Sequence, residues 1–151
     1  MLRRIFLALG LFASMAGLAQ AEGLDNTSWD TLLKKHVRTL RNGQASEVDY
    51  AGFTADRPAL QSYLASTSKV TQPEFDRWSN PVQLAFLINA YNAWTVELVL
   101  TGYPGIKSIK DLGSFIQSPW KKRFIALLGE TRSLDDIEHS LIRGSGRYND
   151  P

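Results

Sequence analysis

The longest run of apolar and uncharged residues lies between Asn80 and Gly102, and its pattern predicts a helix. Asn80 is suited to an N-cap, and Pro81 falls at the first helical position, where a missing N–H costs nothing. Gly102, followed by Pro104, marks the end of the helix. Glu97 is the only charged side chain within it, whereas a surface helix would carry a charged face. We therefore predict a buried central helix over about residues 81–101.

The predicted central helix has two different faces, since successive side chains are about 100° apart. The first face holds Leu84, Leu87, Ile88, Tyr91, Trp94 and Leu98. The second holds Ala85, Asn89, Asn92, Ala93 and Val96, with Glu97 at its margin. A buried amide without a partner costs about 1–3 kcal/mol, so Asn89 and Asn92 either bond neighbouring loops to the helix or line a pocket. Polar residues interrupt any apolar run of about 18, which argues against a membrane span.

The other elements that the pattern predicts are shorter. An amphipathic helix is expected from Asp25 to Leu40, with His36 as a solvated histidine on its basic edge. Residues 46–53 look turn-like, with a short extended piece at 48–50. Further helices are expected at 56–64, from the capping box at 71–74 to about residue 78, and as a single turn at 108–112.

The segment from Lys121 to Leu134 predicts a β-hairpin, because two apolar or β-compatible runs flank Gly129-Glu130. A second capping box, at residues 133–136, opens a helix that runs to about Arg143. A lone hairpin of two strands is marginal in water, so we expect the hairpin at about 122–133 to belong to an incomplete sheet. The expected fold is α+β and predominantly helical, with smaller helices around the central one and a sequence that stops inside the domain.

The first 21 residues have the pattern of a secretory signal peptide. Arg3 and Arg4 form a basic start, residues 5–18 are apolar, and Ala19-Gln20-Ala21 is a small-x-small cleavage site. We predict cleavage after Ala21, a periplasmic or secreted location, and a single domain over residues 22–151 without a membrane span. The alternative is an N-terminal membrane anchor.

The composition limits the partners, nucleophiles and cofactors that we expect for this chain. The chain has 17 basic and 15 acidic residues, and Arg3 and Arg4 are the only charges in the signal segment, so the remaining chain has no net charge. No basic run with interleaved aromatic residues is present, and we expect no nucleic-acid partner. The sequence contains no cysteine, which excludes a thiol nucleophile and thiolate metal ligands from this chain. It has no glycine-rich phosphate loop and no G-x-S-x-G motif, and we expect no cofactor.

His139 is the one candidate acid–base residue, with Asp135 one helical turn before it. A carboxylate at that spacing can orient the imidazole, as in a nucleophile–base–orienter arrangement. The alternative is a surface ion pair worth a few tenths of a kcal/mol. Residues 135–139 also cluster acidic side chains around His139, but contiguous helical residues point in different directions, so we expect no metal site.

Several segments in this order resemble a family of unknown function, domain-of-unknown-function 547. They are Val48-Asp49-Tyr50, AFLINAYNAWTVELVL, YPGIKSIKDLG, the region of Trp120 and SLDDIEHSLIR. The resemblance covers most of the chain after the signal segment. It implies an exported protein of unestablished activity, and it places Ile137-Glu138-His139 within the matching motif.

The resemblance also implies a continuation that this chain lacks. Family members usually extend into a strand-like segment of the form N-C-A-S-x-G-C-P. In such relatives Asn89, Asn92 and His139 could meet a cysteine in thiol chemistry of the Cys–His–amide type. This chain has no cysteine and its sequence stops inside the domain, so we expect this chain alone to be inactive as an enzyme.

Two classes of function therefore remain open. The first is an extracytoplasmic enzyme, a hydrolase or transferase, with His139, Asn89 and Asn92 as candidate catalytic residues and Asp135 as the orienting residue. The second is a non-catalytic module that binds a small molecule, peptide or protein in the periplasm or at the cell surface. A cleft that holds His139 beside both asparagines would favour the enzyme, and a distant, exposed His139 would favour the module.

Overall fold

The structure is a computed structural model that describes residues 22–40, 43–114 and 117–148. The predicted signal segment, residues 1–21, lies outside the described residues. The helical elements are α1 (Thr27–His36), α2 (Tyr50–Ala55), α3 (Arg57–Lys69), α4 (Gln72–Asp76), α5 (Asn80–Leu100), the 3-10 turns η2 (Ile109–Leu112) and η3 (Pro119–Lys121), and the π-helix η4 (Asp136–Arg143). The strands form two antiparallel hairpins, β1 (Val37–Leu40) with β2 (Ala45–Val48), and β3 (Ile125–Leu127) with β4 (Glu130–Arg132). The expectation of a predominantly helical α+β fold is confirmed.

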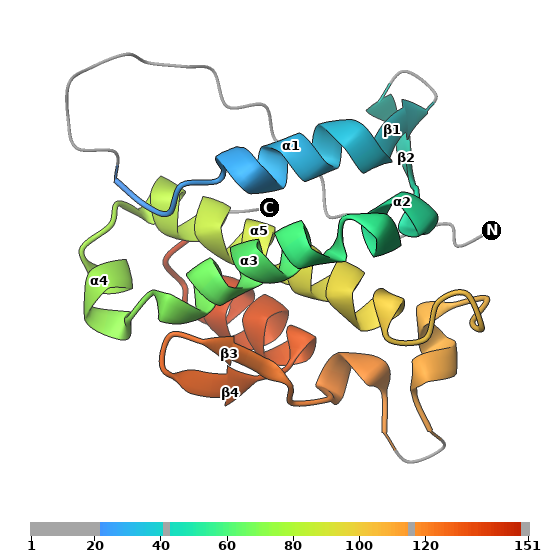
Figure 1. The fold of residues 1–151 in the computed structure, drawn as a ribbon. Coiled ribbons are helices and arrows are strands. Elements are labelled where there is room, and N and C mark those ends of the chain that lie inside the picture. Colours follow the sequence, from blue (N-terminus) through green and yellow to red (C-terminus); the bar gives the residue numbers. More distant parts are fainter. Residues whose placement is uncertain (1–21, 41–42, 115–116, 149–151) are drawn as a thin grey trace.

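The helix α5 is the centre of the molecule, as predicted. It begins at Asn80 with Ser79 rather than Asn80 as its N-cap, and Pro81 lies in its first turn. Figure 1 shows α5 passing between α1 and α3 on one side and η4 with the β3–β4 hairpin on the other. Its one charged residue, Glu97, pairs with Arg57 of α3, whose Nη2 lies 2.7 Å from Glu97 Oε1. The single charge on α5 therefore ties it to α3.

Two apolar clusters lie on opposite sides of α5. The first joins it to β3, η2 and η4, with Leu87, Ile125, Leu134 and Ile137 each fully buried. The second joins it to α1, α2 and α3, through Trp29, Phe53, Leu60, Tyr63, Ala93 and Val96. Burial of one such large side chain contributes about 1.5–3 kcal/mol, so packing on both sides accounts for the low charge of α5.

The prediction of one helix from Asp25 to Leu40 is wrong at its C-terminal end. The helix α1 ends at His36, and Val37 has an extended backbone, with φ −118° and ψ 125°. Val37 then pairs with Val48, and Leu40 pairs with Ala45. The spacing of Val37 and Leu40 suits a helix as well as a strand. Only the pairing with a later segment decides that these residues form a strand. The predicted extended piece at 48–50 is in fact β2 followed directly by α2.

The hairpin predicted at about 122–133 is confirmed. The turn between β3 and β4 has positive φ at both central residues, 54° at Leu128 and 80° at Gly129, the backbone of a tight two-residue turn. Ile125 and Leu127 are fully buried, whereas Ala126 between them is exposed, as strand alternation requires. The hairpin is therefore supported by the first apolar cluster, and β3–β4 forms a sheet of two strands within the described residues.

The capping box that we predicted before the last helix is present. Asp136 N donates to Ser133 Oγ at 3.0 Å, and Ser133 N donates to Asp136 Oδ2 at 2.9 Å. The helix that follows is wider than an α-helix, because Gly144 N donates to the carbonyl of His139, five residues earlier, at 2.8 Å. Such π-turns are rare and are frequent at functional sites. The α3 helix is also longer than predicted, since it continues past Leu64 to Lys69.

Candidate functional site

The pair that sequence analysis singled out, His139 and Asp135, is brought together on η4 and the turn before it. His139 Nε2 lies 3.6 Å from Asp135 Oδ1, with the two side chains 57% and 37% exposed. This distance suits an ion pair but is too long for a hydrogen bond, and the exposure leaves the imidazole open to solvent. The pair is therefore accessible to a ligand from outside.

A second proton-carrying pair lies next to it. The hydroxyl of Tyr91, a buried residue of α5, donates to Glu138 Oε2 at 3.5 Å. Burial raises the pKa of Tyr91 to about 12, with the negative charge of Glu138 as the next cause. The phenol therefore stays protonated and acts as a donor near neutral pH. Arg143 Nη2 holds the other oxygen of Glu138 at 3.3 Å.

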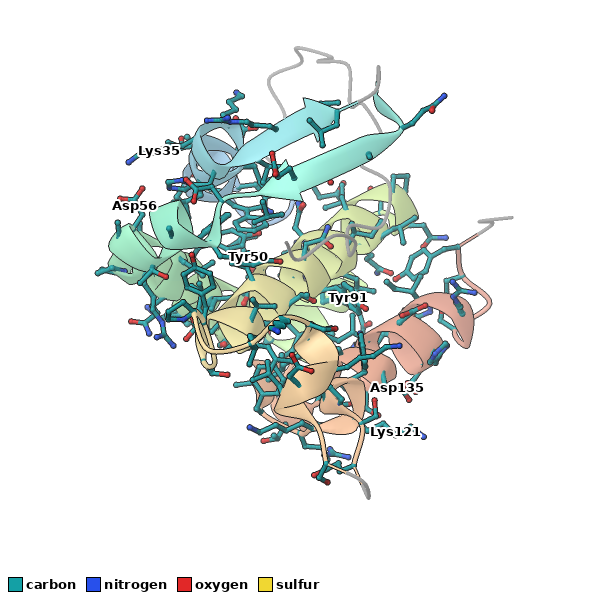
Figure 2. All side chains as sticks on the ribbon, turned by 90° about the vertical axis from the view of Figure 1, so that its right-hand side faces the viewer. Lys35, Tyr50, Asp56, Tyr91, Lys121 and Asp135 are labelled. Atoms are coloured by element: carbon teal, nitrogen blue, oxygen red, sulfur yellow. The ribbon has the colours of Figure 1, made fainter. Side chains whose placement is uncertain are left out.

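The 3-10 turn η3 also contributes a residue, Trp120, to the surroundings of Tyr91. A hydrogen bond from Trp120 opposes the rise in the pKa of Tyr91, and the charge of Asp135 adds to that rise. Trp120 and Asp135 therefore both lie close to the phenol. Figure 2 shows the labelled Tyr91, Asp135 and Lys121 on the same part of the molecule. We call the group of Tyr91, Trp120, Asp135, Glu138 and His139 the η4 site.

The two predicted asparagines lie on α5, and the structure does not join them to the η4 site by a bond. Asn92 is 2% exposed, and its side-chain oxygen has no hydrogen-bond partner. Asn89 is half-buried. Within the described residues, no hydrogen bond links either amide to His139 or Asp135, and neither side chain ties a loop to the helix. Asn92 thus carries a buried acceptor that no group among the described residues satisfies, which is a costly arrangement.

The prediction that His36 is a solvated surface residue is wrong. It is 5% exposed, and its Nε2 lies 2.7 Å from Asp56 Oδ2. Lys35 Nζ reaches the same oxygen at 2.7 Å. Hydrogen bonds from Lys35, first, and from His36 lower the pKa of Asp56. Because α1 ends at His36, its ring turns inward against Phe53, with the ring centroids 4.9 Å apart.

This His36–Asp56 pair was missed because its partners are twenty residues apart and show no local motif. The structure shows that Gly52 makes room for the His36 ring, since an added Cβ would clash with His36 Nδ1, but a single glycine in the sequence does not indicate this contact. The pair fastens the end of α1 to the junction of α2 and α3, where Asp56 lies. Its position between packed elements indicates a structural role.

Two further properties concern the described part of the chain only. Within it, no group of three or more His, Cys, Asp or Glu side chains is placed to hold a metal ion. None of the helices there has both the length and the apolar character that crossing a bilayer requires.

Comparison with known protein families identifies one family whose model matches this sequence. Residues 75–151, just over half of the chain, match the family model described as "Protein of unknown function, DUF547". The chain belongs to this family. No curated protein and no solved structure matches the chain.

The matched range gives the DUF547 region of the chain clear limits. It begins within α4 and includes α5, both 3-10 turns, the β3–β4 hairpin and η4, so every residue of the η4 site lies inside it. The elements α1 to α3 and β1–β2, with the His36–Asp56 pair, lie before it. The family description assigns no activity, so function has to be argued from the site itself.

Proposed function

We propose that this protein is an exported enzyme that uses His139 as a general base in hydrolysis or group transfer. The observation that carries the proposal is the 3.6 Å approach of Asp135 to an accessible His139, beside a second proton-carrying pair, Tyr91 and Glu138. Paired titratable groups of this kind concentrate at catalytic sites. Export is proposed from the basic start, apolar stretch and small-x-small site of residues 1–21.

Each residue has a separate role in the proposal. Asp135 orients the imidazole, and His139 accepts a proton from a water molecule as its oxygen bonds to an ester or amide carbonyl carbon. The protonated His139 then returns that proton to the leaving alcohol or amine as the C–O or C–N bond breaks. The sequence, which lacks cysteine, led us to expect an inactive chain; we propose instead that water is the nucleophile. In relatives with a cysteine within reach, we propose the same role for the histidine toward the thiol.

One α5 amide extends the proposal to substrate binding. Asn89 is half-buried, and we propose that it binds the substrate backbone or amide group while the η4 site provides the base. Asn92 is 2% exposed, so its unpartnered oxygen is closed to a substrate in this structure.

The test is a hydrolysis screen with ester, amide and peptide substrates. General-base catalysis contributes about 10²–10⁴-fold, so H139N should lose that factor in kcat/KM on any substrate that the protein turns over. Lys34, an exposed residue of α1 that pairs with Asp30, provides the control, and K34Q should keep full activity. Equal turnover by the wild type and H139N would refute the proposal.

A specific observation also supports the second class, a binding module. His139 is 57% exposed and has no bond to Asn89 or Asn92 among the described residues, whereas catalytic bases are usually enclosed. In that case the screen yields no turnover, and the η4 site binds a peptide or small molecule. A ligand that raises the melting temperature of the wild type but not of H139N, without turnover, would assign the protein to this class.

A further inference from the structure

Five exposed basic residues gather at one end of the molecule. They lie on and beside η2 and η3, and are Lys107, Lys110, Lys121, Lys122 and Arg123. We call this group the basic end. Figure 1 shows its elements in orange, below α5, and Figure 2 labels Lys121 among them.

The fold fixes the basic end in place. The packing of η2 against η3 is tight, since a Cβ on Gly113 would lie 2.7 Å from Pro119 Cδ. Ile109 and Pro119 are buried, which anchors each turn to the body of the protein. The basic side chains therefore project from short, anchored turns.

The lysine charges of the basic end have no ion-pair partner within the described part of the chain. The carboxylate of Asp111 accepts hydrogen bonds from the backbone N–H groups of Lys107 and Ser108, at 2.8 and 2.9 Å. Arg123 differs from the lysines, because it forms an ion pair with Asp136 at 4.0 Å. None of the four lysines has an ion pair within the described residues, so their charges face solvent.

Charge is also divided unequally over the whole chain. Residues 107–123 carry five basic and one acidic side chain, a net charge of +4. Residues 22–106 and 124–151 together carry ten basic and fourteen acidic side chains, a net charge of −4. The chain without its signal segment is neutral as a whole but strongly polarised.

We propose that the basic end docks on an anionic phospholipid surface, and this inference is independent of the proposed acid–base activity. A small anion needs donors that converge on one point, but the four lysines lie on or beside two separate turns, η2 and η3. Separate lysines on anchored turns suit an extended anionic surface instead. The −4 charge of the remaining chain orients the molecule with its basic end toward that surface.

The test is co-sedimentation with vesicles of phosphatidylcholine, alone or mixed with phosphatidylglycerol. For each form of the protein, we subtract the binding to neutral vesicles from the binding to mixed vesicles. This difference is then compared between the forms at equal protein concentration. Any contribution of the apolar N-terminal residues is common to all forms and cancels. The wild type should bind the mixed vesicles, and added salt should weaken this binding.

Two variants with equal changes of net charge test whether binding depends on the basic end or on the total charge of the protein. The variant K110Q/K121Q/K122Q should lower binding by about fivefold for each lysine, about a hundredfold in all. The control R38Q/K69Q/R77Q removes three exposed charges from β1, α3 and the end of α4, and should bind like the wild type. Far-UV circular dichroism and the melting temperature establish that both variants are folded.

Three results would overturn the proposal. The first is equal binding of the wild type to neutral and mixed vesicles. The second is an equal loss in the two variants, which would show that net charge, rather than the basic end, controls binding. The third is retention on heparin or nucleic acid without vesicle binding, which would assign the basic end to a soluble polyanion. If the triple variant fails to fold, K121Q/K122Q should still lose binding by about 25-fold while K69Q/R77Q does not.

Discussion

The two histidines of this chain lie in opposite environments, although both are next to a carboxylate. His36 is 5% exposed and 2.7 Å from Asp56, whereas His139 is 57% exposed and 3.6 Å from Asp135. The buried pair joins packed elements, and the exposed pair faces solvent. We therefore expect His36 to matter for stability and His139 for activity.

Replacing each histidine by alanine tests this division. His36→Ala removes a buried ring and its bond to Asp56, and should lower the free energy of unfolding by about 2–4 kcal/mol. His139→Ala removes an exposed ion pair and should change it by less than about 0.5 kcal/mol. Urea unfolding at neutral pH measures both. Equal effects of the two substitutions would contradict the assignment of His36 as structural.

The contact between Gly52 and His36 gives a second prediction at this scale. An added Cβ would lie 2.3 Å from His36 Nδ1 and 2.6 Å from Asp49 Oδ2, so Gly52→Ala should destabilise the protein by about 1–3 kcal/mol. Much of this cost should disappear in the H36A background, because the ring is then absent. A double-mutant cycle by urea unfolding measures the coupling, and strict additivity would show that the ring is not the obstacle.

At the scale of elements, the capping box of Ser133 and Asp136 starts the turn that leads into η4. Hydrogen bonding to the Ser133 backbone N–H, the largest cause, lowers the pKa of Asp136 below its usual 3.8. A lowered folded pKa means that the ionised carboxylate stabilises the fold above the unfolded-state pKa. This contribution is lost as the pH falls through the lower, folded-state pKa.

The substitution Asp136→Asn tests the cap and its pH dependence together. At neutral pH it should cost about 1 kcal/mol of unfolding free energy, because the asparagine lacks the carboxylate charge of the capping box. The difference from the wild type should shrink as the pH is lowered below about 4. Asp135→Asn, which removes no capping bond, is the matched control and should cost less at neutral pH. A pH-independent loss in D136N would contradict the role of the charge.

At the scale of the whole molecule, α5 is shared by both apolar clusters, so neither cluster should unfold alone. Leu87→Ala, at a fully buried position, should cost about 2–5 kcal/mol, whereas Leu40→Ala, at an exposed position, should cost less than about 0.5 kcal/mol. Tryptophan fluorescence and far-UV circular dichroism should report one coincident transition for each variant. Separate transitions would show that the clusters are independent.

Local patterns were sufficient for much of this fold. The lack of charge predicted α5, and the two β-compatible runs that flank Gly129-Glu130 predicted the β3–β4 hairpin. The capping boxes at Thr71 and Ser133 marked the starts of α4 and of the turn into η4, because a cap is a contact between near neighbours. These features depend on residues that are close in sequence.

Contacts between distant residues could not be predicted in the same way. The pairing of Val37 with Val48 converts the end of a helical pattern into a strand, and the pairing of His36 with Asp56 buries a polar ring. At the candidate site, the spacing of Asp135 and His139 predicted their approach within one helix. It did not predict Tyr91 or Trp120, which reach the site from other elements.

The central proposal is that Asp135 acts through His139 at an accessible acid–base site. The most direct measurement is kcat/KM for the wild type, D135N, H139N and the double variant, on a substrate identified in the hydrolysis screen. We predict a loss of about 10²–10⁴-fold in H139N, a smaller loss in D135N, and no further loss when D135N is added to H139N. Losses that multiply in the double variant, or an H139N protein as active as the wild type, would contradict this account.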